Sequence, residues 1–230
     1  MDEKWIETLI QFSLFSGISR DELPHTLRCL NAKIKSYKKG EYVAIADTAF
    51  DGIGLVLFGE VAIVKETVSG NRNILAMFKS REMFGEVIAF SEVKLWPATV
   101  IAQSDSHILY LQAQNILGFC DKLCTSHQHL IANMLKIISK KTLVLNKKIE
   151  YLSLKSMRGK LSKYLLEQYK KSGNLTFSMT FNREELADFL NVSRPSMSRE
   201  LGKMRDEGIL EFYKVSLKIL DLAALKSMLE

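Results

Sequence analysis

The apolar positions along the chain follow two different spacings. From Tyr42 to Ala102 they fall in short runs separated by glycines, at residues 42–45, 55–57, 61–64, 74–78 and 98–102. Short apolar runs with turn residues between them are typical of β-strands in an antiparallel sandwich or roll. Ser69-Gly70-Asn71 stands between two of the runs and predicts a hairpin tip. Residues 1–30 instead predict short helices around WIETLIQF and RDELPHTLRCL.

Beyond Ala113 the apolar spacing lengthens to that of a helix. The stripe consists of Leu130, Ile131, Met134, Ile137, Ile138, Leu145, Ile149 and Leu152. Its span predicts a helix of about 25 residues, longer than the usual globular helix. Such a helix either packs on its own sheet or forms a parallel two-helix seam between subunits. The stripe, interrupted by Lys141 and Lys148, favours a dimer seam through Met134, Ile138, Leu145 and Leu152.

A third pattern, FNREELADFLNVSRPSMSRELGKMRDEGIL, begins at Phe181. Asn182 can cap a helix whose third residue is Glu185, which is a variant of the capping box. Ser193 can cap a second helix with Pro195 in its first turn, where the missing N–H costs little. The pattern therefore predicts two helices joined by a tight turn at Asn191.

The second of these helices combines an apolar face with a short basic face. The apolar face is Met197, Leu201 and Met204, and the outer face carries Arg194, Ser196, Ser198 and Arg199. Such a face is small enough to enter a major groove about 12 Å wide. Residues 209–212 and 217–220 then resemble the hairpin of a winged variant. An ordinary helix pair with solvated arginines is the alternative, but the two caps, the compact turn and the hairpin favour DNA binding.

The composition is that of a globular protein with apolar residues for two modest domains. Of 230 residues, 47% are hydrophobic and 25% charged. No apolar run reaches the roughly 18 residues of a membrane span and the start is acidic, so we expect a soluble, cytoplasmic protein without membrane contact. The odd number of cysteines, Cys29, Cys120 and Cys124, favours reduced thiols. The net charge of +6, with 14 basic against 10 acidic residues in 155–230, agrees with a polyanionic partner.

The patterns together predict an α+β protein in three parts. Ser156 is the expected N-cap of a further helix, which places a boundary at residues 153–156. We therefore expect an effector-sensing antiparallel β-roll with flanking helices at 1–124, a dimerisation helix at 125–153 and a winged helix-turn-helix at 154–230.

In this order of parts, about residues 10–225 resemble the Crp/Fnr superfamily of transcription regulators. KGEYV, LFGEVAIVKE and MFGEVIAF are similar to the cyclic-nucleotide-binding-type sheet of that family, which is a jelly-roll-like β-roll. SRPSMSREL is similar to the recognition helix of many clostridial-type members. The resemblance implies a homodimeric, allosteric regulator that binds a palindromic operator in double-stranded DNA, acts with RNA polymerase and is not an enzyme.

The resemblance also assigns roles to individual residues of the helix-turn-helix. It implies that Arg194, Ser198 and Arg199 contact base edges and that Arg183 contacts phosphate. Pro195 stands where the two best-known branches carry glutamate. We therefore expect a half-site that differs from the targets of both branches.

The effector end departs from the nucleotide-binding members. Gly85 and Glu86 match their Gly-Glu pair, but Trp96-Pro97 stands where they carry an arginine and a hydroxyl residue for the cyclic phosphate. Leu145 and Asn146 stand where a hydroxyl pair reaches the purine. We therefore expect no cyclic AMP binding, and a site for a small organic acid or aromatic effector at Gly85, Glu86, Trp96, Pro97, Ala98, Leu145 and Asn146. No cofactor is expected, because an iron-sulfur sensor needs an N-terminal cysteine cluster and only Cys29 lies near that end.

Three other functions are weighed against this one. Cys120, Cys124, His127 and His129 offer two thiolates and two imidazoles, which makes a thiol- or metal-responsive regulator an alternative. Their spacing is not that of a standard zinc finger, so buried cysteines with surface histidines are favoured and no metal is expected. A ligand-binding module acting on a protein partner is a second alternative, although it has no need of SRPSMSRELGKM. An enzyme is not expected, because the chain lacks a nucleophile elbow, a phosphate-binding glycine loop and a His-Glu metal motif.

Overall fold

The computed structural model describes all residues except 1–2, 50–51, 67–71, 94, 119–124 and 230. The chain is an α+β protein with two compact units, residues 1–140 and 141–230. The division falls inside the longest helix, α5 (Thr125–Ser153), rather than at either of its ends. Within the described residues, no helix is both long enough and apolar enough to cross a membrane.

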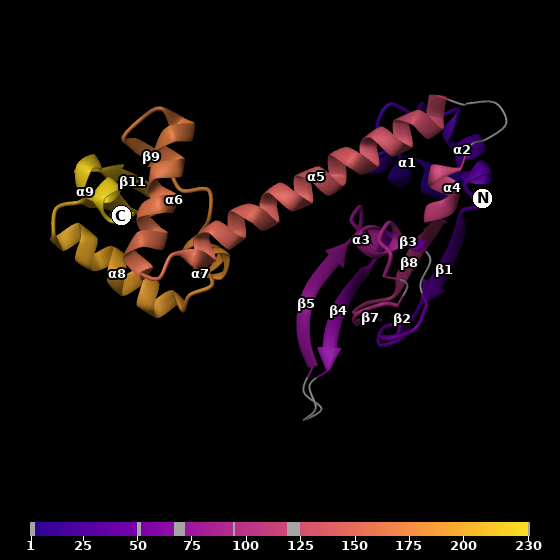
Figure 1. The fold of residues 1–230 in the computed structure, drawn as a ribbon, viewed down its shortest axis with the longest axis horizontal. Coiled ribbons are helices and arrows are strands. Elements are labelled where there is room, and N and C mark those ends of the chain that lie inside the picture. The colour runs from indigo at the N-terminus through magenta and orange to yellow at the C-terminus, as the bar shows by residue number, and fades with distance from the viewer. Residues whose placement is uncertain (1–2, 50–51, 67–71, 94, 119–124, 230) are drawn as a thin grey trace. The chain divides into compact units, whose positions relative to one another are not determined.

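Two four-stranded antiparallel sheets form the body of the first unit (Figure 1). The first sheet has the order β1 (Lys33–Tyr37), β8 (Ser106–Gln112), β3 (Gly52–Phe58), β6 (Met83–Phe84). The second has the order β2 (Tyr42–Ala44), β7 (Thr99–Ala102), β4 (Glu60–Glu66), β5 (Arg72–Lys79). The five expected strands are present, and β1, β6 and β8 are added to them. The expected hairpin tip at residues 69–71 lies outside the described residues, but β4 and β5 on either side of it pair, with Glu66 opposite Arg72.

Short helices cover the outer face of the first sheet. They are η1 (Glu3–Trp5), α1 (Ile6–Leu9), η2 (Ser13–Phe15), α2 (Leu23–Cys29) and α4 (Ala113–Leu117), and a further short helix, α3 (Glu86–Ala89), follows β6. Strand β3 is buried on both faces, because its side chains alternate between two cores. Ile53, Leu55 and Leu57 pack among the helices, whereas Val56 packs between the sheets with Ile108. The helices expected in residues 1–30 are therefore confirmed.

Helix α5 has 29 residues, a little more than expected. Its first half packs on the chain's own core, where Leu130 is fully buried and Met134 is only 4% exposed. Ile138 packs against the same cluster. Met134 and Ile138, two of the four expected seam residues, therefore pack within the first unit, because the N-terminal helices cover them. Leu145 and Leu152 are 58% and 45% exposed, so the apolar stripe is open only in the second half of the helix.

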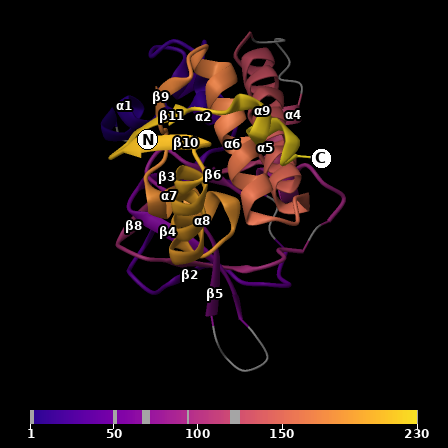
Figure 2. The ribbon, with the colours of Figure 1, turned by 90° about the vertical axis from the view of Figure 1, so that its left-hand side faces the viewer.

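The second unit packs helices α6 (Met157–Ser172), α7 (Arg183–Leu190), α8 (Arg194–Asp206) and α9 (Leu222–Ser227) against a small sheet. The sheet has the order β10 (Leu210–Tyr213), β11 (Ser216–Ile219), β9 (Thr176–Ser178). Figure 2 shows α7 and α8 side by side, as their contacts require. Strands β10 and β11 form the expected hairpin, with Tyr213 opposite Ser216.

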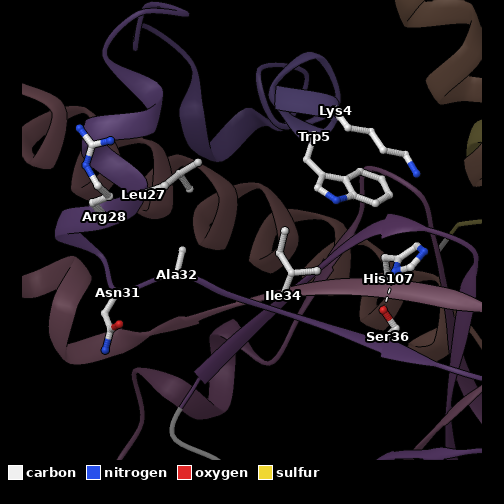
Figure 3. A pocket seen from close by; sticks show the side chains of 9 residues that line it. All are labelled: Lys4, Trp5, Leu27, Arg28, Asn31, Ala32, Ile34, Ser36 and His107. Atoms are coloured by element: carbon white, nitrogen blue, oxygen red, sulfur yellow. Dashed lines mark hydrogen bonds between the residues drawn. The ribbon is translucent and has the colours of Figure 1, made fainter. Parts of the chain in front are cut away.

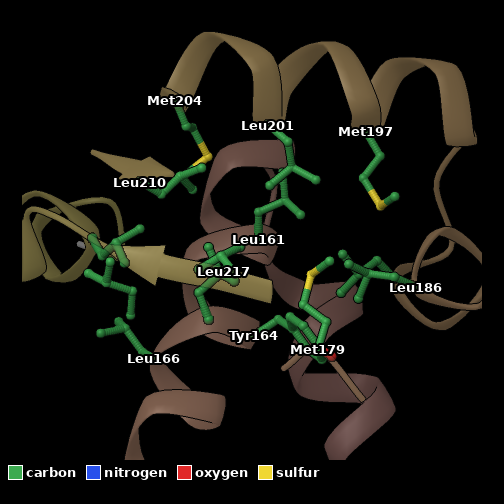
Figure 4. Packing of buried hydrophobic residues seen from close by; sticks show 14 of the residues in the cluster. Leu161, Tyr164, Leu166, Met179, Leu186, Met197, Leu201, Met204, Leu210 and Leu217 are labelled. Atoms are coloured by element: carbon green, nitrogen blue, oxygen red, sulfur yellow. The ribbon is translucent and has the colours of Figure 1, made fainter. Parts of the chain in front are cut away.

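One apolar core holds the second unit together (Figure 4). Met197, Leu201 and Met204 point from α8 toward Leu161 and Tyr164 of α6 and Leu217 of β11. The expected apolar face of α8 is therefore confirmed. Complete burial of such a leucine is worth about 1.5–3 kcal/mol relative to exposure, so this face fixes which side of α8 remains outside.

Candidate nucleic-acid interface and ligand pocket

The two helices α7 and α8 begin at side-chain caps that the sequence predicts. Asn182 Oδ1 accepts from the backbone N–H groups of Glu184 and Glu185, both at 2.9 Å, and Glu185 Oε2 accepts from the Asn182 N–H at 2.8 Å. Ser193 Oγ accepts from the Ser196 N–H and so caps α8. Between the helices, Asn191 has φ +53°, in the left-handed region that ends α7. Each cap satisfies backbone donors that the first turn of a helix leaves unpaired.

The outer side of α8 is polar, basic and largely free of strong partners. Arg194, Ser198 and Arg199 are exposed. Arg194 lies only 3.9 Å from Glu184 Oε2, and Arg199 donates to Ser196 Oγ at 3.3 Å. Ser196 is half-buried, not fully on the outer surface as expected, because its hydroxyl also accepts from Ser193 Oγ at 2.8 Å. Ser196 is therefore engaged at the cap, whereas the two arginines can reorient toward a ligand.

Arg183, at the start of α7, is more buried than the two arginines on the outer side of α8. Its side chain is half-buried, and the guanidinium carbon lies 4.7 Å from the ring centre of Phe212 in β10. The Nη1 atom is buried without a hydrogen-bond partner among the described residues. Burial lowers the pKa of this guanidinium from its ordinary value. A guanidinium remains protonated even so, and its buried Nη1 has the Phe212 ring beside it but no hydrogen-bond acceptor among the described residues, which a phosphate oxygen would supply if the side chain turned outward.

Arg158 of α6 fixes α8 from the side away from its basic face. Its Nε donates to Glu200 Oε1 at 2.6 Å, and its two terminal nitrogens donate to the Glu207 carboxylate at 2.7 and 2.8 Å. These hydrogen bonds lower the pKa of Glu207 and raise that of Arg158. The contact joins residues more than forty positions apart, so the sequence pattern gave no sign of it. It holds both the middle and the end of α8 against α6.

In the first unit, a small cavity lies where the effector site is expected. Its volume is about 220 Å³, and its lining consists of Ile63, Phe78, Phe84, Gly85, Glu86, Val87, Ile88, Trp96, Pro97 and Ala98. Gly85, Glu86, Trp96, Pro97 and Ala98 are thus brought together. The lining holds no lysine or arginine, and its one charged group is the Glu86 carboxyl, which is 4% exposed. Among the described residues of the lining, a phosphate would therefore meet no cation.

Trp96 is part of the core as well as part of the cavity wall. The residue is 2% exposed and meets Phe84 edge to face, with ring centres 6.2 Å apart. Its backbone N–H donates to the Thr48 carbonyl at 3.0 Å, and its carbonyl accepts from Asp47 at 2.8 Å. The backbone of Trp96 is therefore tied to residues 47–48, and its indole packs on Phe84.

Gly54 of β3 makes room for the aromatic wall. It stands opposite Phe84 in the sheet, and a Cβ placed on it would lie 2.3 Å from that ring. No side chain larger than hydrogen fits under the ring without moving it. The depth of Phe84, and through it the position of Trp96, is thus set by a glycine in the neighbouring strand.

The other two expected effector residues, Leu145 and Asn146, lie in the second unit. Both are exposed on α5. Their part in an effector site stays a prediction.

Two residues of the cysteine and histidine cluster, Cys120 and Cys124, lie outside the described residues. His129 is exposed as expected, but His127 is buried and its Nε2 lies 3.2 Å from the Asn115 carbonyl oxygen. His127 is buried rather than on the surface because it closes the gap between α4 and α5. Among the residues that the structure describes, no group of three potential metal ligands occurs.

Comparison with known proteins agrees with this two-unit arrangement. A family model described as a cyclic nucleotide-binding domain matches residues 34–122, and one described as a Crp-like helix-turn-helix domain matches residues 159–228. A search of curated proteins gives no match.

Solved structures of similar fold come from several organisms. The catabolite activator protein of Thermus thermophilus has a TM-score of 0.53 at 20% identity, with 94% of this chain and 98% of that chain covered. The sensor domain of the regulator DNR from Pseudomonas aeruginosa has a TM-score of 0.51 at 21% identity, covering 65% of this chain and 94% of that one. A CooA mutant from Carboxydothermus hydrogenoformans has a TM-score of 0.50 at 21% identity, with 88% and 90% covered. At these identities the likeness concerns the fold.

A cyclic-nucleotide-binding-like roll followed by a winged helix-turn-helix defines a class of DNA-binding regulators. The two family models together account for most of the chain. The chain belongs to the Crp/Fnr superfamily of transcription regulators and is not an enzyme.

Proposed function

We propose that this regulator binds a palindromic operator as a homodimer, with α8 of each subunit in the major groove. The observation that carries the proposal is the exposed face of Arg194, Ser198 and Arg199 on a helix capped by Ser193 and fastened by Arg158. A rigid helix with mobile guanidinium groups meets the need of base readout, because an arginine binds the O6 and N7 atoms of guanine through two hydrogen bonds. Arg183 contributes a phosphate contact beside it.

Selection from a library of random duplexes tests this proposal. The purified full-length protein is expected to enrich one sequence with two inverted half-sites, their centres about 34 Å apart, as two-fold symmetric helix-turn-helix proteins require. Binding of the enriched duplex should weaken steeply with salt, because arginine and lysine displace counterions from phosphates. Recovery of no common sequence, or of one unpaired half-site, would contradict the proposed docking. Retention of a protein partner with no DNA preference would favour a regulatory module of another kind.

The proposed effector is a small apolar or aromatic compound, not cyclic AMP. It binds in the cavity that Phe84 and Trp96 line, and the family resemblance predicts Leu145 and Asn146 as further effector residues. Support comes from the described residues of the lining, which offer apolar and aromatic side chains and the Glu86 carboxyl but no cation. A buried phosphate without a paired cation costs several kcal/mol, and a stacked ring does not return as much.

Calorimetric titration with cyclic AMP distinguishes this site from a nucleotide site. We expect no heat of binding up to millimolar concentration, and no change in DNA binding on addition of cyclic AMP. Micromolar affinity would overturn the effector proposal and leave the DNA-binding proposal standing, since the two depend on separate parts of the chain.

The remaining parts of the proposed function follow from these. Residues 1–124 sense the effector, residues 125–153 join the subunits and residues 154–230 bind DNA. The protein acts in the cytoplasm, and RNA polymerase is the proposed protein partner at the promoter.

A further inference from the structure

A second and larger hollow in the first unit lies outside the roll, between the N-terminal helices and the edge of the first sheet (Figure 3). Its volume is about 630 Å³, within the several hundred Å³ that are usual for small-molecule sites. Its lining consists of Lys4, Trp5, Leu27, Arg28, Asn31, Ala32, Ile34, Ser36 and His107. None of these residues belongs to the effector cavity or to the helix-turn-helix.

One part of this lining is apolar. Leu27 of α2 is fully buried, and Trp5 and Ile34 are half-buried. Strand β1 is at the edge of its sheet and alternates, so Ile34 and Ser36 point toward this hollow. Figure 3 shows the Trp5 indole extending from η1 toward Ile34. A flat ring placed between them would contact apolar surface on both sides.

The other part of the lining is cationic, and none of the described residues that line the hollow is acidic. Lys4 Nζ lies 4.9 Å from the ring centre of Trp5, which holds the ammonium group over the indole in the wall of the hollow. Within the described residues, neither Lys4 nor Arg28 forms an ion pair, whereas Arg20 and Lys38 nearby pair with Glu7 and Asp105. Among the described residues, the positive charge of Lys4 and Arg28 therefore has no acidic partner within ion-pair distance.

His107 and Ser36 add a hydrogen-bond donor whatever the tautomer of the imidazole. The Ser36 Oγ and His107 Nδ1 atoms lie 2.8 Å apart. If the hydroxyl donates, Nε2 carries the remaining ring proton, and if Nδ1 donates, the hydroxyl proton is available. The imidazole also lies beside the indole, with ring centres 5.2 Å apart. The pair thus presents one N–H or O–H next to the aromatic wall.

We propose that this hollow is a second ligand site, for an aromatic carboxylate. The ring of the ligand lies against Trp5 and Ile34, and its carboxylate is bound by Lys4 and the Ser36–His107 pair, while Arg28 adds positive charge at the other end. A neutral aromatic compound would lose the charged contacts, and a small inorganic anion would lose the apolar ones. The inference does not depend on the proposed DNA-binding or effector roles.

The two tryptophans of the chain make the test specific, because one lies in each pocket. The full-length protein labelled with nitrogen-15 gives two indole N–H signals, and Trp5→Phe assigns that of Trp5. We expect 2-naphthoate to shift the Trp5 signal saturably. The neutral 2-naphthalenemethanol and inorganic phosphate should each bind at least about tenfold more weakly, which corresponds to about 1.4 kcal/mol.

Substitutions then separate the charge of the site from the general charge of the unit. Lys4→Gln should weaken naphthoate binding about tenfold, the loss of one charge-assisted contact. Lys33→Gln is the matched control, because it removes the same charge from β1 at a residue that lines a different hollow, and it should leave the affinity within about twofold. No saturable shift of Trp5, movement of the Trp96 signal alone, equal binding of the alcohol or of phosphate, or equal effects of the two substitutions would each overturn the proposal.

Discussion

In the proposed docking, single side chains on α8 set the sequence preference for DNA, and Arg183 at the start of α7 adds affinity for any sequence. Arg194→Ala and Arg199→Ala should each weaken binding of the selected operator by roughly 1–3 kcal/mol, because each removes a bidentate contact to a base. Fluorescence anisotropy with labelled duplexes measures this. Lys226→Ala in α9 is the matched control, an exposed cation of the same unit, and should change affinity little.

Substitution of Arg183 should affect all DNA sequences equally, in contrast to substitution of Arg194 or Arg199. Arg183→Gln should weaken operator and unrelated duplex about equally and lower the slope of log affinity against log salt by about one, as loss of one phosphate contact does. The glutamine keeps the aliphatic part of the side chain and removes the guanidinium group that lies on Phe212. Operator affinity equal to that of the parent in all three arginine variants would show that another surface binds DNA.

At the scale of elements, the capping box at Asn182 determines whether α7 forms fully. Asn182→Ala should destabilise α7 by about 1 kcal/mol, since two backbone donors lose their acceptor. Hydrogen exchange of the α7 amides measures the local change without requiring that the two units unfold together. Asn174→Ala removes an exposed asparagine whose amide donates to the last carbonyl of α6, at Ser172, and should leave the α7 amides unaffected. Equal exchange in both variants would contradict the role of the cap.

The same elements show which features a sequence can predict. The caps at Ser156, Asn182 and Ser193 were predictable because an N-cap acts on backbone groups two or three residues away. The burial of Met134 and Ile138 within their own unit could not be predicted in this way. Helical spacing shows only which residues share a face, whereas the N-terminal helices, distant in sequence, determine which part of that face is covered.

In the candidate sites, the lining of the roll cavity was predicted from Gly85, Glu86, Trp96, Pro97 and Ala98 through family resemblance. Two contacts could not be predicted, because each joins segments that are distant in sequence. They are the ion pairs of Arg158 with Glu200 and Glu207 and the contact of Arg183 with the Phe212 ring. Strand β1 was also not predicted, because it is polar and its lysines alternate with only one aliphatic side chain.

At the scale of the whole molecule, the open half of the α5 stripe predicts a homodimer. Light scattering at micromolar concentration should give twice the mass of the chain. Leu145→Glu and Leu152→Glu should produce monomers, because a carboxylate in a two-helix seam is buried without a partner. Leu143→Glu is the control, since Leu143 is 69% exposed and lies on another side of the helix. A monomeric parent protein, with and without DNA, would refute the seam.

Because Gly54 has no side chain and Phe84 fills the space beside it, we expect positions 54 and 84 to co-vary in evolution. Because a Cβ at 54 would lie 2.3 Å from the Phe84 ring, either residue restricts what the other can become. In a library that randomises both codons, alanine at 54 should be depleted beside phenylalanine and recovered beside a smaller aliphatic residue. The effects of substitutions at the two positions on fitness should then be non-additive. Homologues that replace the glycine should also have a smaller residue at position 84. Because Phe84 lines the roll cavity, the shape of that cavity should differ in those homologues.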